Sequence, residues 1–182
     1  MSIVNHIHKR IVTALALTVV FSLPANAQEV NIDDLFAELQ SAPVEQTDRI
    51  AKQIMSIWSQ SGSASMDLLL KRGEDALENG ETQAAIDHFS ALVDHAPDFA
   101  EAYHARATAY FDAGYFGPAL ADLHTVLSLN PRHFGALTGL AFILESTDEP
   151  EKALETYRAV LELLPNDQDV LDAVTRLEDV AL

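Results

Sequence analysis

Apolar residues recur at helical spacing in three separate parts of the chain. Residues three, four and seven positions apart predict a first amphipathic helix, at Ile32, Leu35, Phe36 and Leu39. A second set follows Pro43, at Ile50, Ile54, Ile57 and Trp58. A third set lies in segment 168–182, at Val170, Leu171, Val174 and Leu177. Each set gives a helix one apolar face, so the pattern predicts amphipathic helices at both ends of an all-α protein.

Between these segments the pattern repeats itself. Pro97, Pro131 and Pro165 are each 34 residues apart, and a proline stops a preceding helix from running on. Placing this proline 32nd divides the region into units 66–99, 100–133 and 134–167. Small residues then fall at places 8 and 20 of each unit and bulky ones at place 24: Gly73, Ala107 and Ala141; Ala85, Ala119 and Ala153; Phe89, Leu123 and Tyr157. The region is therefore a threefold repeat, which organises the fold.

These units resemble the tetratricopeptide repeat, which has a large residue at place 4, small residues at 8 and 20, large or aromatic residues at 11 and 24, and proline at 32. Ala76 at place 11 of the first unit departs from that pattern. The resemblance implies an α-solenoid of stacked helical hairpins that forms a right-handed superhelix, in which the small residues let paired helices approach closely. Segment 168–182 would be the extra helix that covers the apolar face of the last unit.

The segment 28–65 fits the repeat only in part. Stepping the register back by one period puts Ala51 at place 20 and Met55 at place 24, but Pro43 shortens the first helix and a serine replaces the repeat proline. We expect a degenerate capping unit packed on the first full repeat. The alternative is a separate docking hairpin joined to the repeats by the serine-rich linker 60–65.

Residues 1–27 have the features of a secretory signal peptide. Lys9 and Arg10 precede an apolar run over residues 11–23, and an Ala-x-Ala pattern ends at Ala27. An apolar run of this length is shorter than the roughly 20 residues that span a bilayer. We therefore expect cleavage after Ala27, no stable membrane insertion, and a location in the bacterial periplasm.

The charge of the chain restricts its partners. Eleven basic residues face 28 acidic ones, a formal charge of -17, and there is no cysteine. Cleavage after Ala27 would remove Lys9 and Arg10 and no acidic residue, leaving nine basic residues and a formal charge of -19. This excess of acid disfavours a nucleic-acid partner. The lack of cysteine excludes a disulfide scaffold and a zinc site built on thiolates.

The sequence offers little for catalysis. It contains neither a G-x-S-x-G motif nor a glycine-rich phosphate loop. Five histidines follow the expected cleavage site, at His88, His95, His104, His124 and His133. None forms an i, i+4 pair or an H-E-x-x-H motif, so we interpret them as solvated or interface residues and expect no catalytic residue, no metal and no cofactor. Trp58 is expected to be a packing residue, and a partner contact is its alternative role.

The resemblance also implies a binding surface. In the family, the first helix of each unit lines a concave groove that holds a peptide or a partner helix. The corresponding positions here are Leu70, Glu74, His104, Thr108, Phe111, Asp112, Thr138, Phe142 and Glu145. Phe111 and Phe142 are the candidate anchors, because exposed aromatic residues supply much of the energy of binding; packing between repeats is their alternative role. The clamp of Lys, Asn and Arg with which some members grip an acidic peptide is missing here.

These observations favour a non-catalytic interaction module or scaffold of the bacterial cell envelope. Its partner would be a basic or neutral protein segment attracted by the negative charge, and salt should weaken the association. A structural protein that associates with itself is one alternative. A hydrolase whose site combines histidines with carboxylates is another.

Overall fold

The computed structural model describes residues 31–180, which are helical with no strand among them. The helices are α1 (Ile32–Ser41), α2 (Val44–Trp58), α3 (Ala64–Glu78), α4 (Thr82–His95), α5 (Ala100–Asp112), α6 (Phe116–Leu129), α7 (Phe134–Ser146), α8 (Pro150–Leu163) and α9 (Gln168–Val180). The all-α prediction is thus confirmed, whereas the predicted signal peptide lies outside the described residues. Within residues 31–180, no helix is both long enough and apolar enough to cross a membrane.

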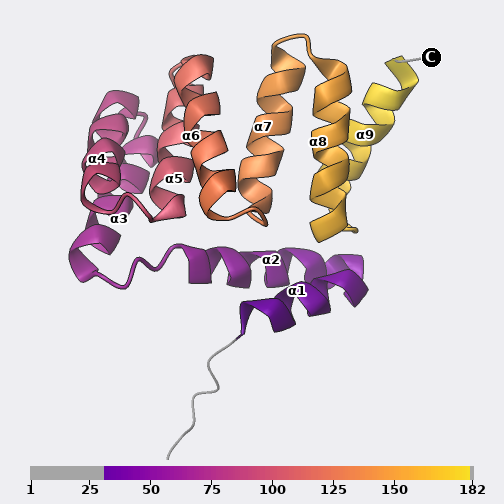
Figure 1. Cartoon of the computed structure of the whole chain (residues 1–182), viewed down its shortest axis with the longest axis horizontal. Helices are drawn as coiled ribbons and strands as arrows, with labels where there is room; N and C mark the ends of the chain where they lie inside the picture. Colours follow the sequence, from indigo (N-terminus) through magenta and orange to yellow (C-terminus); the bar gives the residue numbers. More distant parts are fainter. Residues whose placement is uncertain (1–30, 181–182) are drawn as a thin grey trace, which may run out of the picture.

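Helices α3 to α8 form three antiparallel pairs that stack side by side (Figure 1). Each pair occupies one of the units expected from the 34-residue period. Close approach within a pair depends on the small residues at places 8 and 20. A Cβ atom added to Gly73 of α3 would lie within 2.6 Å of ring atoms of Phe89 on α4. Ala85, Ala119 and Ala153 are fully buried at place 20, so the repeated small residues mark the points of helix contact.

The turn between the two helices of each unit has the same conformation. Gly80 and Gly114 have φ angles of 75° and 76°, and Asp148 takes the same place in the third unit with φ 64°. In each turn, the next backbone N–H donates to a carbonyl of the preceding helix, as in the bond from Glu81 N to Ala76 O at 2.8 Å. This is the left-handed helix end that glycine favours and that an aspartate can also adopt.

The N-terminal hairpin of α1 and α2 packs against the third unit and α9. Its fully buried residues Leu39, Ile50 and Ile54 share one apolar core with Phe134 of α7 and Leu164 after α8. Figure 1 shows α2 lying across the edge of the stack, below α7 and α8. The expected cap on the first repeat is therefore wrong. The connection over residues 59–63 turns α2 away from α3, so neighbours in sequence are not neighbours in the core.

Polar contacts hold the hairpin in this place. Gln40 Nε2 donates to the carbonyl of Glu162 at 2.9 Å, and Asn166 Nδ2 donates to the carbonyl of Ala42 at 2.8 Å. Both acceptors are backbone groups at or beyond helix ends, which lack partners within their own helix. These contacts fix the hairpin across the turn that links α8 to α9.

Helix α9 packs on α8 and carries the end of the solenoid. Asp167 caps its start by accepting a hydrogen bond from the Val170 N–H at 3.1 Å. Val170, Ala173 and Leu177 are buried in the same core as the N-terminal hairpin. The C-terminal end of the array is thus covered by both α9 and the hairpin.

Candidate binding groove and its histidine cluster

A pocket of about 340 Å³ lies between α5 and α7, the first helices of the second and third units. Its lining is largely apolar and consists of His104, Ala107, Thr108, Phe111, Leu123, Gly135, Thr138, Gly139, Phe142 and Ile143. Five of the nine groove positions implied by the resemblance lie in this lining: His104, Thr108, Phe111, Thr138 and Phe142. The structure therefore brings together the part of the candidate groove that the second and third units supply.

Two glycines and two aromatic rings shape the pocket. Gly135 and Gly139 on α7 let the helix lie close to its neighbours, since an added Cβ atom would lie 3.2 Å from His104 Nε2 at the first position and 3.6 Å from a methyl group of Leu123 at the second. The rings of Phe111 and Phe142 meet edge to face, with centroids 5.4 Å apart and planes 76° apart, and the centroids of Phe111 and Phe116 are 5.6 Å apart. Phe142 keeps 50% of its surface exposed. Phe111 therefore packs between two rings, whereas Phe142 presents a large apolar surface to solvent.

The other four predicted groove residues do not line the pocket. Leu70 is 4% exposed and belongs to the core of the first unit with Phe89. Its assignment to an open groove is therefore wrong, because α3 turns this position toward the core. Glu74 and Asp112 are exposed on α3 and α5 but lie outside the lining. Glu145 is engaged elsewhere, in an ion pair with Arg176 of α9.

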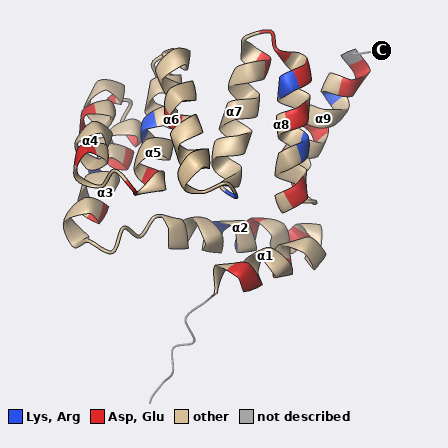
Figure 2. Cartoon of the chain, in the orientation of Figure 1, with Lys and Arg blue, Asp and Glu red and all other residues tan. Residues whose placement is uncertain are grey.

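Charge around the pocket is sparse and negative. The residues that line it include no lysine or arginine. Helix α7 has a single charged residue, Glu145, and is uncoloured along nearly all its length in Figure 2. On α5, Arg106 is held by Asp122 through two hydrogen bonds of 2.7 and 2.8 Å. Partial desolvation, followed by the nearby charge of Glu101, raises the pKa of Glu74, although much of the surface of this side chain is exposed. The groove therefore offers no free cation to an acidic ligand.

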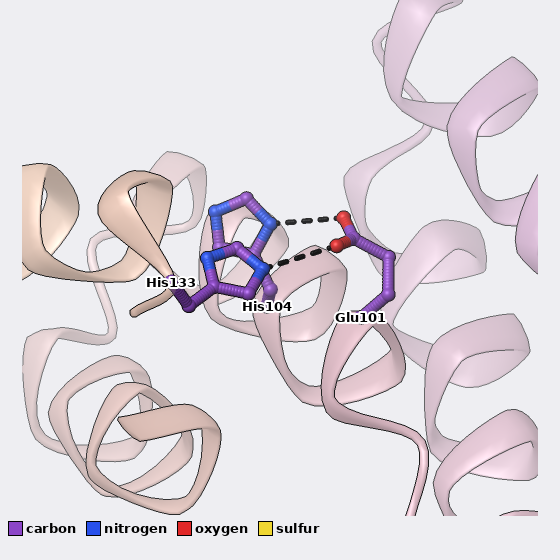
Figure 3. Close-up of side chains that lie close together, drawn as sticks. All are labelled: Glu101, His104 and His133. Atoms are coloured by element: carbon purple, nitrogen blue, oxygen red, sulfur yellow. Dashed lines mark hydrogen bonds and ion pairs between the residues drawn. The ribbon is translucent and has the colours of Figure 1, made fainter. Parts of the chain in front are cut away.

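Behind the pocket wall lies a cluster of Glu101, His104 and His133 (Figure 3). One carboxylate oxygen of Glu101 accepts a hydrogen bond from His104 Nδ1 at 3.0 Å, and the other accepts one from His133 Nε2 at 3.1 Å. His133 is 1% exposed and stands at the start of α7, where its Nδ1 accepts the N–H of Ala136 at 3.1 Å. The carboxylate thus bridges two imidazoles of the second unit, one on α5 and the other at the start of α7.

The hydrogen bonds decide the charge state of the cluster. Burial acts to raise the pKa of Glu101, but the hydrogen bonds from His104 and His133 outweigh it and bring the pKa to about 2. Burial lowers the pKa of His133, against the opposing effect of Glu101. At neutral pH the cluster therefore holds a charged carboxylate beside a neutral, buried His133.

This cluster was not predicted from the sequence. Glu101 and His133 lie far apart along the chain, and no motif joins them. They meet because the start of α5 and the start of α7 are adjacent in the stack. The interpretation of His133 as a solvated or interface residue is wrong, since it is buried. The 34-residue register could have indicated this contact. It puts Glu101 at place 2 and His133 at place 34 of the same unit, and the structure shows that these two places face each other.

The hydrogen bonds of His133 bear on metal binding at the cluster. The three side chains can bring ligand atoms within 4.8 Å of one another. However, His133 Nδ1 accepts a backbone N–H, so the neutral ring carries its proton on Nε2. Binding a metal through Nε2 would move that proton to Nδ1 and break the cap of α7. The geometry therefore favours a hydrogen-bonded cluster over a preformed metal centre.

Trp58, at the end of α2, covers the cluster. Its ring stacks on His133, with centroids 4.6 Å apart and planes 21° apart, and it also contacts Phe134 and Phe36. His133 in turn lies against His104, with ring centroids 4.5 Å apart. These contacts make Trp58 a packing residue and connect the N-terminal hairpin to the wall of the pocket.

Comparison with known proteins agrees with this architecture. Two family models, each described as a tetratricopeptide repeat, match residues 70–116 and 112–177. A TPR repeat-containing protein of Rhizobium etli is 31% identical over 156 residues, which cover 85% of this chain and 76% of that protein. The Hsp70-Hsp90 organizing protein of Triticum aestivum is 29% identical over 106 residues, 58% of this chain but only 18% of that protein.

Solved structures show the same fold. The first TPR domain of Spaghetti (RPAP3), bound to the HSP90 peptide SRMEEVD, superposes with a TM-score of 0.61 at 24% sequence identity. The match covers 64% of this chain and 92% of that domain. Together, the repeating helical pairs, the family models and the Rhizobium relative show that the chain belongs to the tetratricopeptide-repeat family.

Proposed function

We propose that this protein is an exported, non-catalytic interaction module of the bacterial cell envelope that holds a segment of a partner protein in the groove between α5 and α7. The observation that carries the proposal is the apolar pocket of about 340 Å³ beside the half-exposed ring of Phe142. Exposed aromatic rings at the rim of such a pocket are typical anchors of protein interfaces. Protein binding also agrees with the family to which the chain belongs.

The charge around the groove selects the kind of partner. The peptide bound by the RPAP3 domain, SRMEEVD, is rich in acidic residues. Here the pocket lining holds no basic residue, and the chain as a whole has a formal charge of -17. An acidic peptide would meet repulsion without a compensating ion pair, so the partner segment is basic or neutral.

Export is supported by the N-terminal sequence, in which a basic start, an apolar run and an Ala-x-Ala pattern follow one another over residues 1–27. The mature protein would then begin at Gln28. Mass spectrometry of the protein recovered from the periplasmic fraction tests this point. A mass that retains residues 1–27 would contradict it.

The groove itself is tested by removing its two aromatic anchors. Crosslinking in intact cells, followed by recovery of the protein, should yield a partner with the wild-type chain. Phe111→Ala combined with Phe142→Ala should lower that recovery about tenfold or more, because anchor residues dominate binding energy. Leu68→Ala is the control, since Leu68 is also about half exposed, at 49%, but lies on α3 outside the pocket. Equal recovery from all three chains would remove the groove as the binding site.

A further inference from the structure

One ring nitrogen gives the apolar pocket a hydrogen-bonding point. His104 belongs to the pocket lining, and its Nδ1 is used by Glu101 at 3.0 Å. Its other nitrogen, Nε2, lies on the opposite side of the ring, away from Glu101 in Figure 3. This atom faces Gly135 on α7: a Cβ atom added there would lie 3.2 Å from it. Gly135 has no side chain to stand between Nε2 and the pocket, and the side chain of His104 keeps 17% of its surface exposed.

The cluster behind the wall sets the chemical character of this nitrogen. A carboxylate only accepts hydrogen bonds, so His104 must carry its proton on Nδ1 to donate to Glu101. In the neutral ring, Nε2 then has a lone pair and acts as an acceptor. His133 does not supply a donor, because its Nε2–H is bound to the other oxygen of Glu101. The pocket therefore presents an imidazole acceptor in a largely apolar lining, whose other polar side chains are the hydroxyls of Thr138 and of Thr108, which donates to the carbonyl of His104 at 3.1 Å.

We propose that this acceptor selects the anchor of the partner: a tryptophan side chain that enters the pocket and donates its indole N–H to His104 Nε2. The inference rests on the proposed function and adds the chemistry of the bound residue. It follows from complementarity between the donor of the ligand and the acceptor of the pocket. Indole has one donor and no acceptor, so its single polar atom is matched and its rings meet Phe111 and Phe142.

The volume of the pocket also favours a tryptophan side chain. A pocket of about 340 Å³ stands at the lower end of the range for small-molecule sites, which is roughly 300–1,000 Å³. It therefore suits one large side chain rather than an extended ligand. An aliphatic anchor of similar size would exclude water from Nε2 without offering a donor, and a buried acceptor without a partner weakens binding. Tryptophan is also among the residues most enriched at binding hot spots.

The test compares two bicyclic probes of nearly the same shape. Indole carries the N–H donor, whereas benzothiophene has sulfur in its place and is more apolar. Binding to the full chain is measured by NMR titration at pH 8, where an ordinary imidazole is neutral. Indole should bind about fivefold or more tightly than benzothiophene, which is the effect of one hydrogen bond. Without a hydrogen bond, transfer from water into the apolar pocket would favour the more apolar benzothiophene. Tighter binding of indole would therefore have to come from its N–H donor.

Two glycines of α7 provide matched variants that keep all three side chains of the cluster. Gly135→Ala puts a methyl group 3.2 Å from His104 Nε2 and should abolish the preference for indole. Gly139→Ala makes the same change in the same helix and pocket, but its methyl group meets Leu123 at 3.6 Å, an ordinary contact. It should keep the preference. Both positions are helical, where alanine is favoured over glycine, so both variants are expected to fold.

Three results would overturn the inference. Equal affinity of the wild-type chain for the two probes would show that the acceptor does not select the ligand. An unchanged preference in Gly135→Ala would show that His104 Nε2 is not the acceptor. Failure of both probes to bind would show that the pocket does not take an indole. The proposed function fails separately, if the Phe111 and Phe142 variant recovers its partner as well as the wild type does.

Discussion

Gly73 and Phe89 show how a single residue controls the spacing of two helices. The ring of Phe89 fills the place that a side chain at position 73 would need. We expect Gly73→Ala to destabilise the protein by about 1–3 kcal/mol through overpacking, although alanine favours a helix. Urea unfolding measures the change. Gly117→Ala in α6 is the control, because no atom lies within 4 Å of the added methyl group. A Gly73→Ala protein as stable as this control would refute the packing account.

The Glu101–His133 pair predicts a loss of stability in acid. Burial lowers the pKa of His133 from its ordinary value of 6.5, so its stabilising effect is complete above pH 6.5 and is lost as the pH falls below it. Glu101, with a pKa of about 2 in place of 4.5, adds stability that is lost as the pH falls from 4.5 toward 2. The midpoint temperature of thermal unfolding should therefore decrease as the pH is lowered from 7 to 5. It should decrease again as the pH is lowered below 4.5.

Replacing His133 separates its contribution to the loss of stability in acid from the contribution of Glu101. His133→Asn keeps an acceptor for the Ala136 N–H at the start of α7 but does not titrate. Its thermal midpoint should change little between pH 7 and pH 5, whereas His124→Asn, at an exposed position, should behave as the wild type. If the His133→Asn protein shows the full wild-type loss in this range, the assignment to His133 is incorrect.

Residue identities in the groove could be predicted only in part from the sequence. The repeat register assigns His104, Thr108, Phe111, Thr138 and Phe142 to one groove, and all five line one pocket because their helices repeat the same geometry. It failed for Leu70, which the register treats like His104 although its side chain is buried. It could not show the bond between Glu101 and His133, since that depends on how adjacent helix starts align.

At the scale of helices, the N-terminal hairpin is the element whose position the sequence did not reveal. Its two helices were recognisable from their apolar faces, since Leu39 and Ile54 fall on helical spacing. Their packing partner was not, because the repeat register assumes that each unit stacks on the next. The hairpin instead buries these residues against α7, α8 and α9. The path of residues 59–63 determines whether the hairpin lies against the first unit or against the third unit and α9, and the repeat pattern does not specify that path.

Hydrogen exchange distinguishes the two positions of the hairpin. Leu39→Ala removes a fully buried side chain from the core shared with α8 and α9 and should destabilise the protein by about 2–5 kcal/mol. Exchange should speed up mainly in α1, α2, α8 and α9. Leu92→Ala is the matched variant, because Leu92 is equally buried but belongs to the core of α3, α4 and α5. Faster exchange in α3 and α4 after Leu39→Ala would instead indicate a cap on the first repeat.

For the molecule as a whole, net charge predicts the salt dependence of binding. The 28 acidic residues outnumber the 11 basic ones, so a basic partner would be attracted over several ångströms and this attraction is screened by salt. The association rate should fall by about tenfold or more between 50 and 500 mM salt, with a smaller change in the dissociation rate. Surface plasmon resonance with the recovered partner measures both rates. An association rate independent of salt would exclude electrostatic attraction.

The overall fold was largely predictable because the same pattern of residues occurs in three successive units. Pro97, Pro131 and Pro165 fix the period, and the small and bulky residues between them specify how paired helices meet. Repeats contact mainly their neighbours, so three correct local assignments build most of the molecule. The N-terminal hairpin falls outside this rule, since it contacts units distant in sequence.

Site-specific photocrosslinking in intact cells tests most directly whether the groove between α5 and α7 binds a partner protein. A photoreactive phenylalanine analogue is placed at Phe142, in the pocket lining, and in a second chain at Leu68, which is equally exposed but lies outside it. If the groove holds the partner, position 142 should give one main adduct with a partner protein and position 68 should give little. Adducts of equal yield from both positions, or adducts only between two copies of this chain, would contradict it.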